Sequence, residues 1–119
     1  MSANRAKGTR AETAVVEYLR NWNPAVERRA PSGKYDRGDI AGIVDVCIEV
    51  KSHAHIDLAE FVDEAEMEAL NARAQVGVAW IKRRGKGSPA DWYVAMSGSQ
   101  FVKLLIAAGY LPEYDPETP

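Results

Sequence analysis

The chain has 119 residues, of which 46% are hydrophobic and 27% charged, and its formal net charge is -2 at pH 7. This size and composition fit one globular domain with one core, and the sequence contains no apolar run long enough to span a bilayer. The only cysteine, Cys47, excludes an internal disulfide and a multi-cysteine zinc site. The N-terminal segment is polar and has no signal-peptide core, so we expect a reducing cytoplasm, that of a host cell if the gene is viral.

The charges are unevenly distributed along the chain. Residues 1–37 carry eight basic and four acidic residues, and residues 73–103 carry six basic residues and one acid. Residues 52–72 hold six acids and no lysine or arginine. Two basic regions can steer a polyanion even when the total charge is near neutral, although each single charge is more simply explained as solvated surface.

The first half of the chain predicts one helix followed by short strands. Apolar residues recur at helical spacing over residues 9–22, where Thr9 and Glu12 have the form of a capping box. Residues 25–30 are a short strand candidate that ends in a turn. The stretches 39–44 and 46–51 are rich in Ile and Val and are expected to form a tight antiparallel hairpin.

The second half predicts two helices and two strands. A helix with its acids on the solvent face is expected to start after Asp57 as N-cap, and strands are expected at 76–81 and 92–96. The last helix would follow Ser97 and stop at Gly109. Its inward residues would be Phe101, Leu104, Leu105 and Ala108.

This order of elements predicts an α/β domain, a mixed β-sheet flanked by α-helices, over residues 1–111. An acidic C-terminal tail, residues 112–119, follows it.

The predicted strand 46–51 carries an acid and a base on one face. Its branched apolar side chains share the face that suits the core, whereas Cys47, Glu49 and Lys51 share the other. A hairpin would bring Asp39 beside Glu49 and Lys51. Paired carboxylates favour a hard divalent cation, which polarises a phosphoryl oxygen and lowers the pKa of bound water, and a lysine stabilises charge on phosphate. The alternative is that Glu49 and Lys51 form an ordinary surface salt bridge.

Four short motifs occur in order along the chain. They are Lys-Gly-x-x-x-Glu at 7–12, Arg-Arg-Ala-Pro-Ser-Gly at 28–33, Asp-Ile at 39–40, and Ile-Glu-Val-Lys at 48–51. Together they resemble the PD-(D/E)xK nuclease superfamily, and within it the Holliday-junction resolvases of archaeal and viral type. The resemblance covers roughly residues 7–96. The usual proline before the aspartate is Gly38 here, and glycine is expected to make the same tight approach.

The resemblance implies a restriction-endonuclease-like fold and a nuclease centre. Glu12, Asp39 and Glu49 would hold Mg2+ or Mn2+ with help from the Val50 carbonyl. Lys51 would be the catalytic lysine. Enzymes of this kind are homodimers that nick two opposed strands of a four-way junction in double-stranded DNA, and the last predicted helix is a candidate for the dimer interface.

Further residues near the scissile phosphate and along the DNA follow from the same motifs and from the basic segments. Ser32 would lie near the scissile phosphate. The expected phosphate-binding residues of the resemblance are Lys7, Arg10, Arg28 and Arg29. Lys34 and a basic, glycine-containing loop extend this set. The basic residues of the loop are Arg83, Arg84 and Lys86, and a solvated surface loop would explain them equally well.

Several residues near this centre have simpler explanations. Glu12 could serve only the capping box, and Asp36 and Asp45 are rival carboxylates expected to be turn residues. His53 and His55 could bind zinc, but no third histidine exists, so they are expected to be loop residues. The alternative functions are another PD-(D/E)xK-type DNA nuclease, of repair or restriction type, and a non-catalytic nucleic-acid-binding domain.

Overall fold

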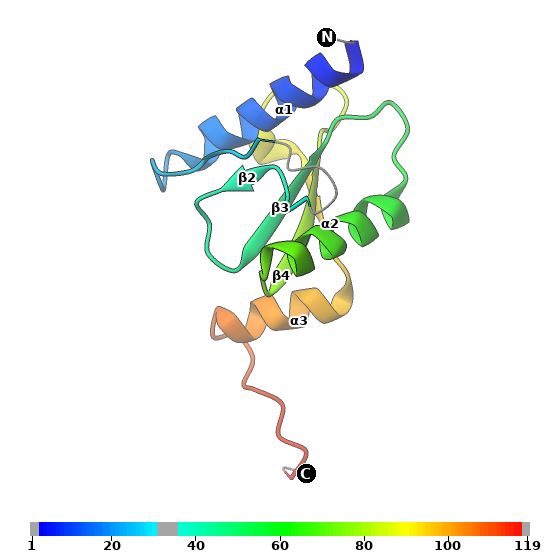
Figure 1. Ribbon diagram of the computed structural model, residues 1–119. Helices are drawn as coiled ribbons and strands as arrows, with labels where there is room; N and C mark the ends of the chain where they lie inside the picture. Colours follow the sequence, from blue (N-terminus) through cyan, green and yellow to red (C-terminus); the bar gives the residue numbers. More distant parts are fainter. Residues whose placement is uncertain (1–2, 31–35, 118–119) are drawn as a thin grey trace.

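The structure, a computed structural model, describes residues 3–30 and 36–117 (Figure 1). Within them the chain forms three α-helices: α1 (Ala3–Leu19), α2 (Leu58–Ala72) and α3 (Gly98–Ala107). The strands are β1 (Glu27–Arg28), β2 (Ile40–Ala41), β3 (Val46–Lys51), β4 (Val76–Ile81) and β5 (Tyr93–Ala95), and a single 3-10 turn, η2 (Pro89–Asp91), precedes β5. The prediction of a mixed α/β fold is confirmed. No described helix is both long and apolar enough to cross a membrane.

The main sheet has the strand order β3-β4-β5. Strand β3 runs parallel to β4, with Lys51 opposite Ile81, because α2 carries the chain back between them. Strand β5 runs antiparallel to β4. The sheet is therefore mixed, and β3 is one of its edges.

The predicted hairpin between residues 39–44 and 46–51 is wrong. Strand β2 instead pairs antiparallel with β1, with Arg28 opposite Ile40. Gly42, at φ +101°, holds β2 there, because a Cβ atom on it would lie 2.9 Å from the carbonyl oxygen of Ala25. Asp45 is a turn residue as predicted, with φ 63°.

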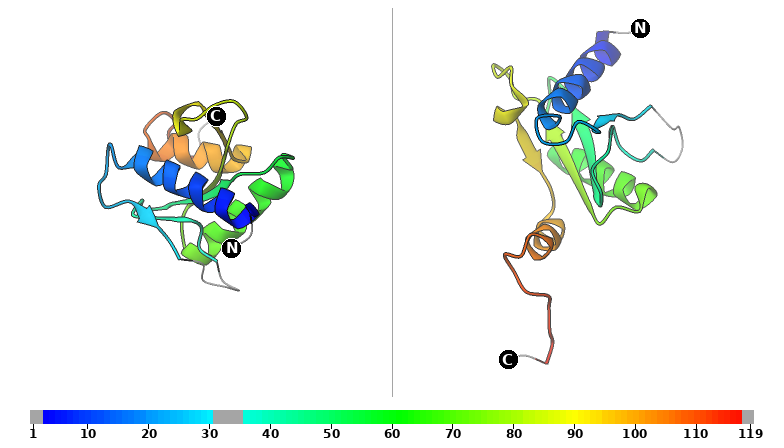
Figure 2. Two further views of the ribbon diagram at one scale, coloured as in Figure 1. Left: turned by 90° about the horizontal axis from the view of Figure 1, so that it is seen from above. Right: turned by 90° about the vertical axis from the view of Figure 1, so that its left-hand side faces the viewer.

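Two helices cover opposite faces of β3 and β4, as side-chain alternation along the strands requires (Figures 1 and 2). On one face α1 contributes Val15 and Val16 to a core that includes Ile48 and Val50. On the other face α2 packs closely on β4, since a Cβ on Gly77 would lie 2.4 Å from the Ala65 carbonyl oxygen. This second face of β3 carries Glu49 and Lys51, so α2 covers charged side chains.

Helix α1 starts earlier than predicted. It begins at Ala3, so Thr9 lies inside the helix and the predicted capping box of Thr9 and Glu12 is wrong. Gly8 does not break the helix, since residues on both sides of it form regular turns. Glu12 is consequently a mid-helix residue with no capping role, and its side chain lies only 15% exposed.

The two later helices start where predicted but bury different faces. Asp57 caps α2, its side chain accepting a hydrogen bond from the Glu60 amide at 3.2 Å. The prediction that all acids of α2 face solvent is wrong, because Glu68 is buried. The prediction of inward residues in α3 is also wrong: no residue of α3 is buried, and Phe101 is 49% exposed. Gly109 follows α3 with φ 85°, as its predicted stop requires.

Candidate metal and phosphate site

Asp39 is bound to the free edge of β3 by two hydrogen bonds. Its amide donates to the Ile48 carbonyl at 3.0 Å, and its Oδ2 accepts from the Val50 amide at 2.7 Å. Asp39 therefore reaches the strand beside Glu49 and Lys51, although no hairpin brings it there. The Lys51 carbonyl bonds to the Lys82 amide on the β4 side, so the Val50 carbonyl, one residue away, faces the edge where Asp39 lies.

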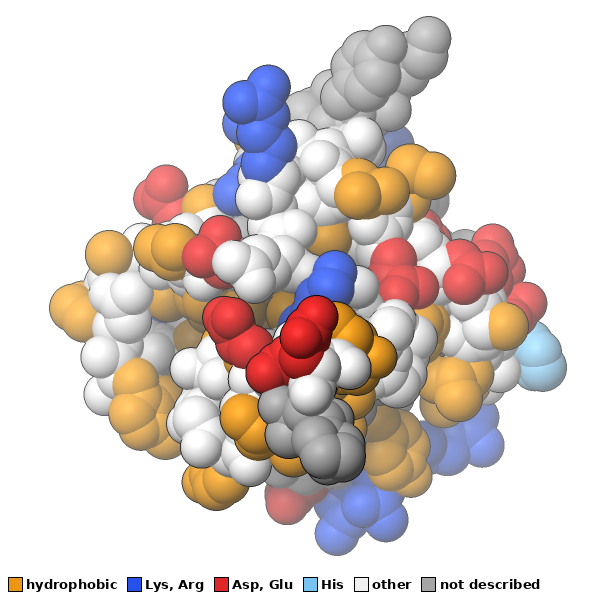
Figure 3. Space-filling view, turned by 90° about the horizontal axis from the view of Figure 1, so that it is seen from below, with side chains coloured by type: hydrophobic (Ala, Val, Ile, Leu, Met, Phe, Trp, Pro, Cys, Tyr) orange, Lys and Arg blue, Asp and Glu red, His pale blue; other side chains and the backbone are white. Residues whose placement is uncertain are grey.

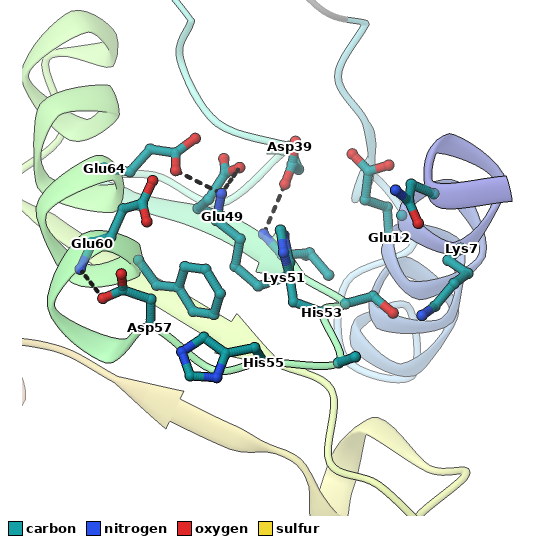
Figure 4. A pocket seen from close by; sticks show the side chains of 16 residues that line it. Lys7, Glu12, Asp39, Glu49, Lys51, His53, His55, Asp57, Glu60 and Glu64 are labelled. Carbon is teal, nitrogen blue, oxygen red and sulfur yellow. Dashed lines mark hydrogen bonds and ion pairs between the residues drawn. The ribbon is translucent and has the colours of Figure 1, made fainter. Parts of the chain in front are cut away.

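A cleft of about 670 Å³ opens at this edge, between the N-terminal halves of α1 and α2 (Figure 4). Figure 4 places the Asp39 side chain between Glu49 on β3 and Glu12 on α1. Every predicted metal-binding and catalytic residue among the described residues lines this cleft: Glu12, Asp39, Glu49, Val50 and Lys51. Ser32, the remaining predicted catalytic residue, lies outside the described residues.

Lys51 lies between two carboxylates. Its Nζ is 2.7 Å from Glu64 on α2 and 3.4 Å from Glu49 on β3, and it lies 5.4 Å from the centre of the Phe61 ring. Burial lowers the pKa of Lys51, but the hydrogen bond with Glu64 and the negative charges of Glu49 and Glu64 outweigh burial and raise it overall. Lys51 is thus a buried cation in the wall of the cleft, with an exposed fraction of only 8%. The alternative of a surface salt bridge is correct in pairing Glu49 with Lys51 but wrong in its location, because both residues are buried.

Two acids of the cleft, Asp39 and Glu49, have pKa values raised above their ordinary range. Burial, followed by a hydrogen bond and repulsion from Glu12, raises the pKa of Asp39 to about 8. Burial, followed by a hydrogen bond with Glu68, raises the pKa of Glu49 to about 11, although Lys51 opposes this. A bound cation would replace the protons that these carboxyl groups otherwise retain.

A second acidic group lies behind the cleft, against α2. Carboxylate oxygens of Asp36, Glu49 and Glu68 lie within 4.8 Å of one another. The Asp36 side chain accepts from the Gly38 amide at 3.1 Å, so the predicted turn role is correct but incomplete.

Glu68 escaped prediction because its acidic neighbours on α2 suggested a solvated face. A signal was present, however: Glu60, Glu64 and Glu68 repeat every four residues and form one stripe of the helix. The distance along the axis between residues four apart in a helix is nearly the same as that between residues two apart in a strand. Glu64 accordingly meets Lys51, and Glu68 meets Glu49.

Gly38 has a stricter role than the resemblance suggested. Its φ is +90°, which proline cannot adopt, and a Cβ atom would lie 2.6 Å from the Cys47 sulfur. The predicted tight approach is therefore present, but in a backbone conformation that proline cannot adopt. The turn before Asp39 has a shape of its own, which the Cys47 thiol helps to hold by donating to the Arg37 carbonyl at 3.3 Å.

The predicted DNA-binding residues are only partly gathered at the cleft. Lys7 lines the cleft and also a smaller hollow of about 300 Å³ beside it, where it meets Arg84 and Lys82 from the loop after β4. The loop thus brings basic side chains to the cleft from a distant part of the sequence. Arg83 instead lies over the Tyr93 ring at 5.4 Å, and Lys86 is exposed.

The arginines near β1 are engaged within the protein. Arg28 lies 3.4 Å from Glu12, and Arg29 donates to the Arg37 carbonyl at 3.2 Å. Arg10 is exposed on α1, and Lys34 lies outside the described residues. Arg28 was predicted only as a DNA-binding residue, and the structure shows that it also forms an ion pair with Glu12 of the cleft.

The two histidines are loop residues that line the cleft. His53 lies against the Phe61 ring, with 4.9 Å between ring centres, and both His53 and His55 are exposed. Among the described residues, no group of three potential metal ligands includes either histidine. The zinc alternative therefore has no support from the described part of the chain.

The fold and the cleft together define a mixed α/β protein with a lysine and several buried carboxylates at one edge of its sheet. No protein-family model matches the chain, and no curated protein or solved structure matches it significantly.

Proposed function

We propose that this protein is a divalent-metal-dependent DNA endonuclease that cleaves four-way junctions by paired phosphodiester hydrolysis. The observation that supports this most is the convergence of Asp39, Glu49 and Lys51 on one cleft at the edge of β3. Glu12 reaches the same cleft from α1, so four residues predicted from three separate motifs share one site.

The donor set fits Mg2+ or Mn2+. Glu12, Asp39 and Glu49 would hold the cation together with the Val50 carbonyl, and oxygen donors are those that hard divalent cations prefer. The pKa values of Asp39 and Glu49, raised by burial to about 8 and about 11, indicate a deficit of positive charge that a cation would correct. When bound, such a cation supplies Lewis-acid activation at the phosphate.

The protein's own groups position and stabilise the substrate. The Lys51 ammonium, held 2.7 Å from Glu64, is placed to stabilise negative charge on the phosphate that is cleaved. Lys7 and Arg84 extend the positive potential from the cleft to neighbouring phosphates. Contacts to phosphates rather than to base edges would make recognition depend on DNA shape.

A labelled four-way junction tests the proposal. With Mg2+ the parent should nick opposed strands, and Asp39→Asn or Glu49→Gln should abolish cleavage while Asp63→Asn, an exposed acid of α2, should not. Equal cleavage by the parent and by Asp39→Asn would refute the site. Equal cleavage of linear duplex would replace the junction assignment with another nuclease of repair or restriction type. Metal-independent junction binding without cleavage would indicate a non-catalytic binding domain.

The same proposal includes a homodimer. Each chain offers one such cleft, whereas paired cleavage needs two, so a second copy is the partner that the reaction requires. The exposed apolar residues of α3, with Phe101 as the largest, are the contact surface that we propose. Gln100 of α3 binds the Gly77 amide near the start of β4, whereas the cleft lies at the end of β3, so pairing there leaves the cleft open.

A further inference from the structure

The acidic group behind the cleft is a distinct feature of the molecule. Glu49 belongs both to this group and to the cleft, whereas neither Asp36 nor Glu68 is among the described residues that line the cleft. Glu68 comes from α2 and Asp36 from the segment before β2. Three segments that are distant in the sequence therefore place one carboxylate each at a single point.

Two of these carboxylates are deeply buried, and one oxygen of each lacks a hydrogen-bond donor. Glu49 is 6% exposed and Glu68 is 4% exposed. Within the described residues, no hydrogen-bond partner reaches Oε2 of either side chain. A buried carboxylate oxygen without a donor costs several kcal/mol, and either a proton shared by the two side chains or a bound cation would offset this cost.

Neither Lys51 nor Asn71 neutralises the unpartnered oxygens of this acidic group. Lys51 contacts Oε1 of Glu49 at 3.4 Å, and its shorter contact is with Glu64 at 2.7 Å. Asn71 donates to the backbone carbonyl of Asp36 at 2.9 Å, which fixes the position of that segment without neutralising any carboxylate. Lys51 therefore supplies one positive charge beside a larger number of acidic side chains.

We propose that Asp36, Glu49 and Glu68 form a second divalent-cation site, with Glu49 shared between this site and the cleft. The donors are all carboxylate oxygens, which selects Mg2+, Mn2+ or Ca2+ over zinc. Two oxygens on opposite sides of a cation at about 2.4 Å lie about 4.8 Å apart. The observed limit of 4.8 Å on the oxygen separations is therefore compatible with all three residues binding one ion.

A cation at this point would join three parts of the molecule, namely the turn before β2, strand β3 and helix α2. It would also fix the orientation of Glu49 from behind, while Lys51 contacts Glu49 from the cleft. The site does not depend on the proposed nuclease activity, because it follows from the burial and positions of its own carboxylates. Binding measured without DNA therefore tests it separately.

The test is a titration of chelator-treated, full-length protein with Mn2+, followed by electron paramagnetic resonance and by calorimetry. Glu68→Gln and Asp36→Asn should each weaken the binding of one Mn2+ by roughly tenfold or more. Glu12→Gln should leave that ion in place, because Glu12 belongs to the cleft alone. Asp63→Asn, which removes one exposed acid from the same helix, should bind Mn2+ as the parent does.

Thermal unfolding gives a second measurement. Saturating Mn2+ should raise the melting temperature of the parent by several degrees, and this increase should be smaller in Glu68→Gln. Circular dichroism confirms that each variant is folded, and the partly exposed position of Asp36 makes Asp36→Asn the variant that keeps the test decisive if Glu68→Gln does not fold.

Equal Mn2+ stoichiometry and affinity in the parent, Asp36→Asn and any folded Glu68→Gln protein would overturn the proposal. That outcome would mean that Glu49 and Glu68 share a proton instead of a cation. Loss of junction cleavage is not part of this test, so a protein that fails to cut DNA but loses one Mn2+ in Asp36→Asn would still have the second site.

Discussion

Two regions of this molecule reverse the usual distribution of side chains. Along β3 and α2, charged residues are buried: Glu49, Lys51 and Glu68 all have exposed fractions below 9%. On α3, apolar residues are exposed, with Phe101 at 49% and Leu104 at 37%. Burying charge and exposing contiguous apolar surface are both unfavourable for an isolated chain. Under the proposed function a cation and a phosphate would complete the first region, and a second copy of the chain would cover the other.

The two regions lie toward opposite ends of the main sheet. The cleft opens where β3 ends, near the beginnings of α1 and α2 (Figure 4). Helix α3 packs near the beginning of β4, where Gln100 accepts a hydrogen bond from the Gly77 amide at 2.9 Å. Viewed from the end that carries α3, the surface shows hydrophobic side chains interspersed with a group of acidic ones (Figure 3). Changes in one region should thus leave the other intact, which makes the contrast testable.

Lys51→Met should have the largest effect, because it removes the only cation between Glu49 and Glu64 and keeps a side chain of similar length. We expect junction cleavage to fall by about 10²- to 10³-fold, as for loss of one charge-stabilising group in an active site. The free energy of unfolding at pH 8 should fall by about 1 kcal/mol or less, since Lys51 loses its ion pair with Glu64, whose side chain is 42% exposed. Lys103→Met, at an exposed lysine of α3, is the matched control. Cleavage and stability within error of the parent would show that the buried ion pair has no part in function.

The stability of the cation-free protein should depend strongly on pH. The pKa of Asp39 is raised to about 8 and that of Glu49 to about 11, so both acids bind protons more tightly in the folded protein than in the unfolded chain. The stabilisation is therefore complete below about pH 4, the unfolded pKa, and is lost as the pH rises toward 8 and beyond. Urea unfolding in chelator should show a loss on the order of 1 kcal/mol per pH unit in this range.

Two additions sharpen that experiment. Saturating Mg2+ or Mn2+ should restore stability at high pH, because the cation replaces the protons that Asp39 and Glu49 lose. Asp39→Asn should flatten the part of the curve below about pH 8 that belongs to Asp39. Stability that rises from pH 5 to pH 8 without metal would contradict the raised pKa values and the deficit of positive charge in the cleft.

Comparing the two regions also shows which features of the fold and of the site could be predicted from the sequence. Alternation along residues 46–51 correctly predicted that Glu49 and Lys51 share a face, and the Asp39-Ile40 motif correctly predicted their neighbour. The hairpin was wrong because β2 pairs with β1, and β3 takes its strand partner from β4, which starts 25 residues after β3 ends. Short apolar runs specify strands well but do not specify which strands pair.

Burial was harder to predict than element type. Glu68 was predicted to face solvent because acids normally do, and only the packing of α2 against the charged face of β3 buries it. Phe101 was predicted to face inward because the apolar spacing of α3 is typical of a core helix. The same spacing describes a helix that binds a second chain, so the pattern cannot distinguish the domain's own core from an interface.

Phe101→Asp tests the apolar side of the contrast. We expect a parent dimer and a monomeric variant in size-exclusion chromatography with light scattering, because a charge would be buried in the proposed interface. The free energy of unfolding of the monomer should change by less than about 1 kcal/mol, since the side chain is half-exposed. Val44→Asp introduces the same charge at an apolar residue that is 85% exposed and lies in the turn before β3. This variant should remain dimeric. A monomeric parent would remove the homodimer from the proposed function.

Lys7→Ala should have the smallest effect, because it removes one phosphate contact from the rim of the cleft and leaves both regions folded. Lys7 shares the hollow beside the cleft with Arg84, so each should contribute about one unit to the slope of log binding constant against log salt. At physiological salt the affinity for a four-way junction should fall several-fold, and it should fall equally for junctions of different sequence.

Lys103→Ala serves as the control, since Lys103 lies on α3, the helix that packs at the far end of the sheet. A fluorescence anisotropy titration with Ca2+ in place of Mg2+ measures binding, with each protein compared at several salt concentrations. If Lys103→Ala lowers the slope as much as Lys7→Ala, the DNA does not follow the cleft, and the basic residues near it are surface charges. If only Lys7→Ala lowers it, the path of the DNA runs over the edge of β3, where the buried carboxylates lie.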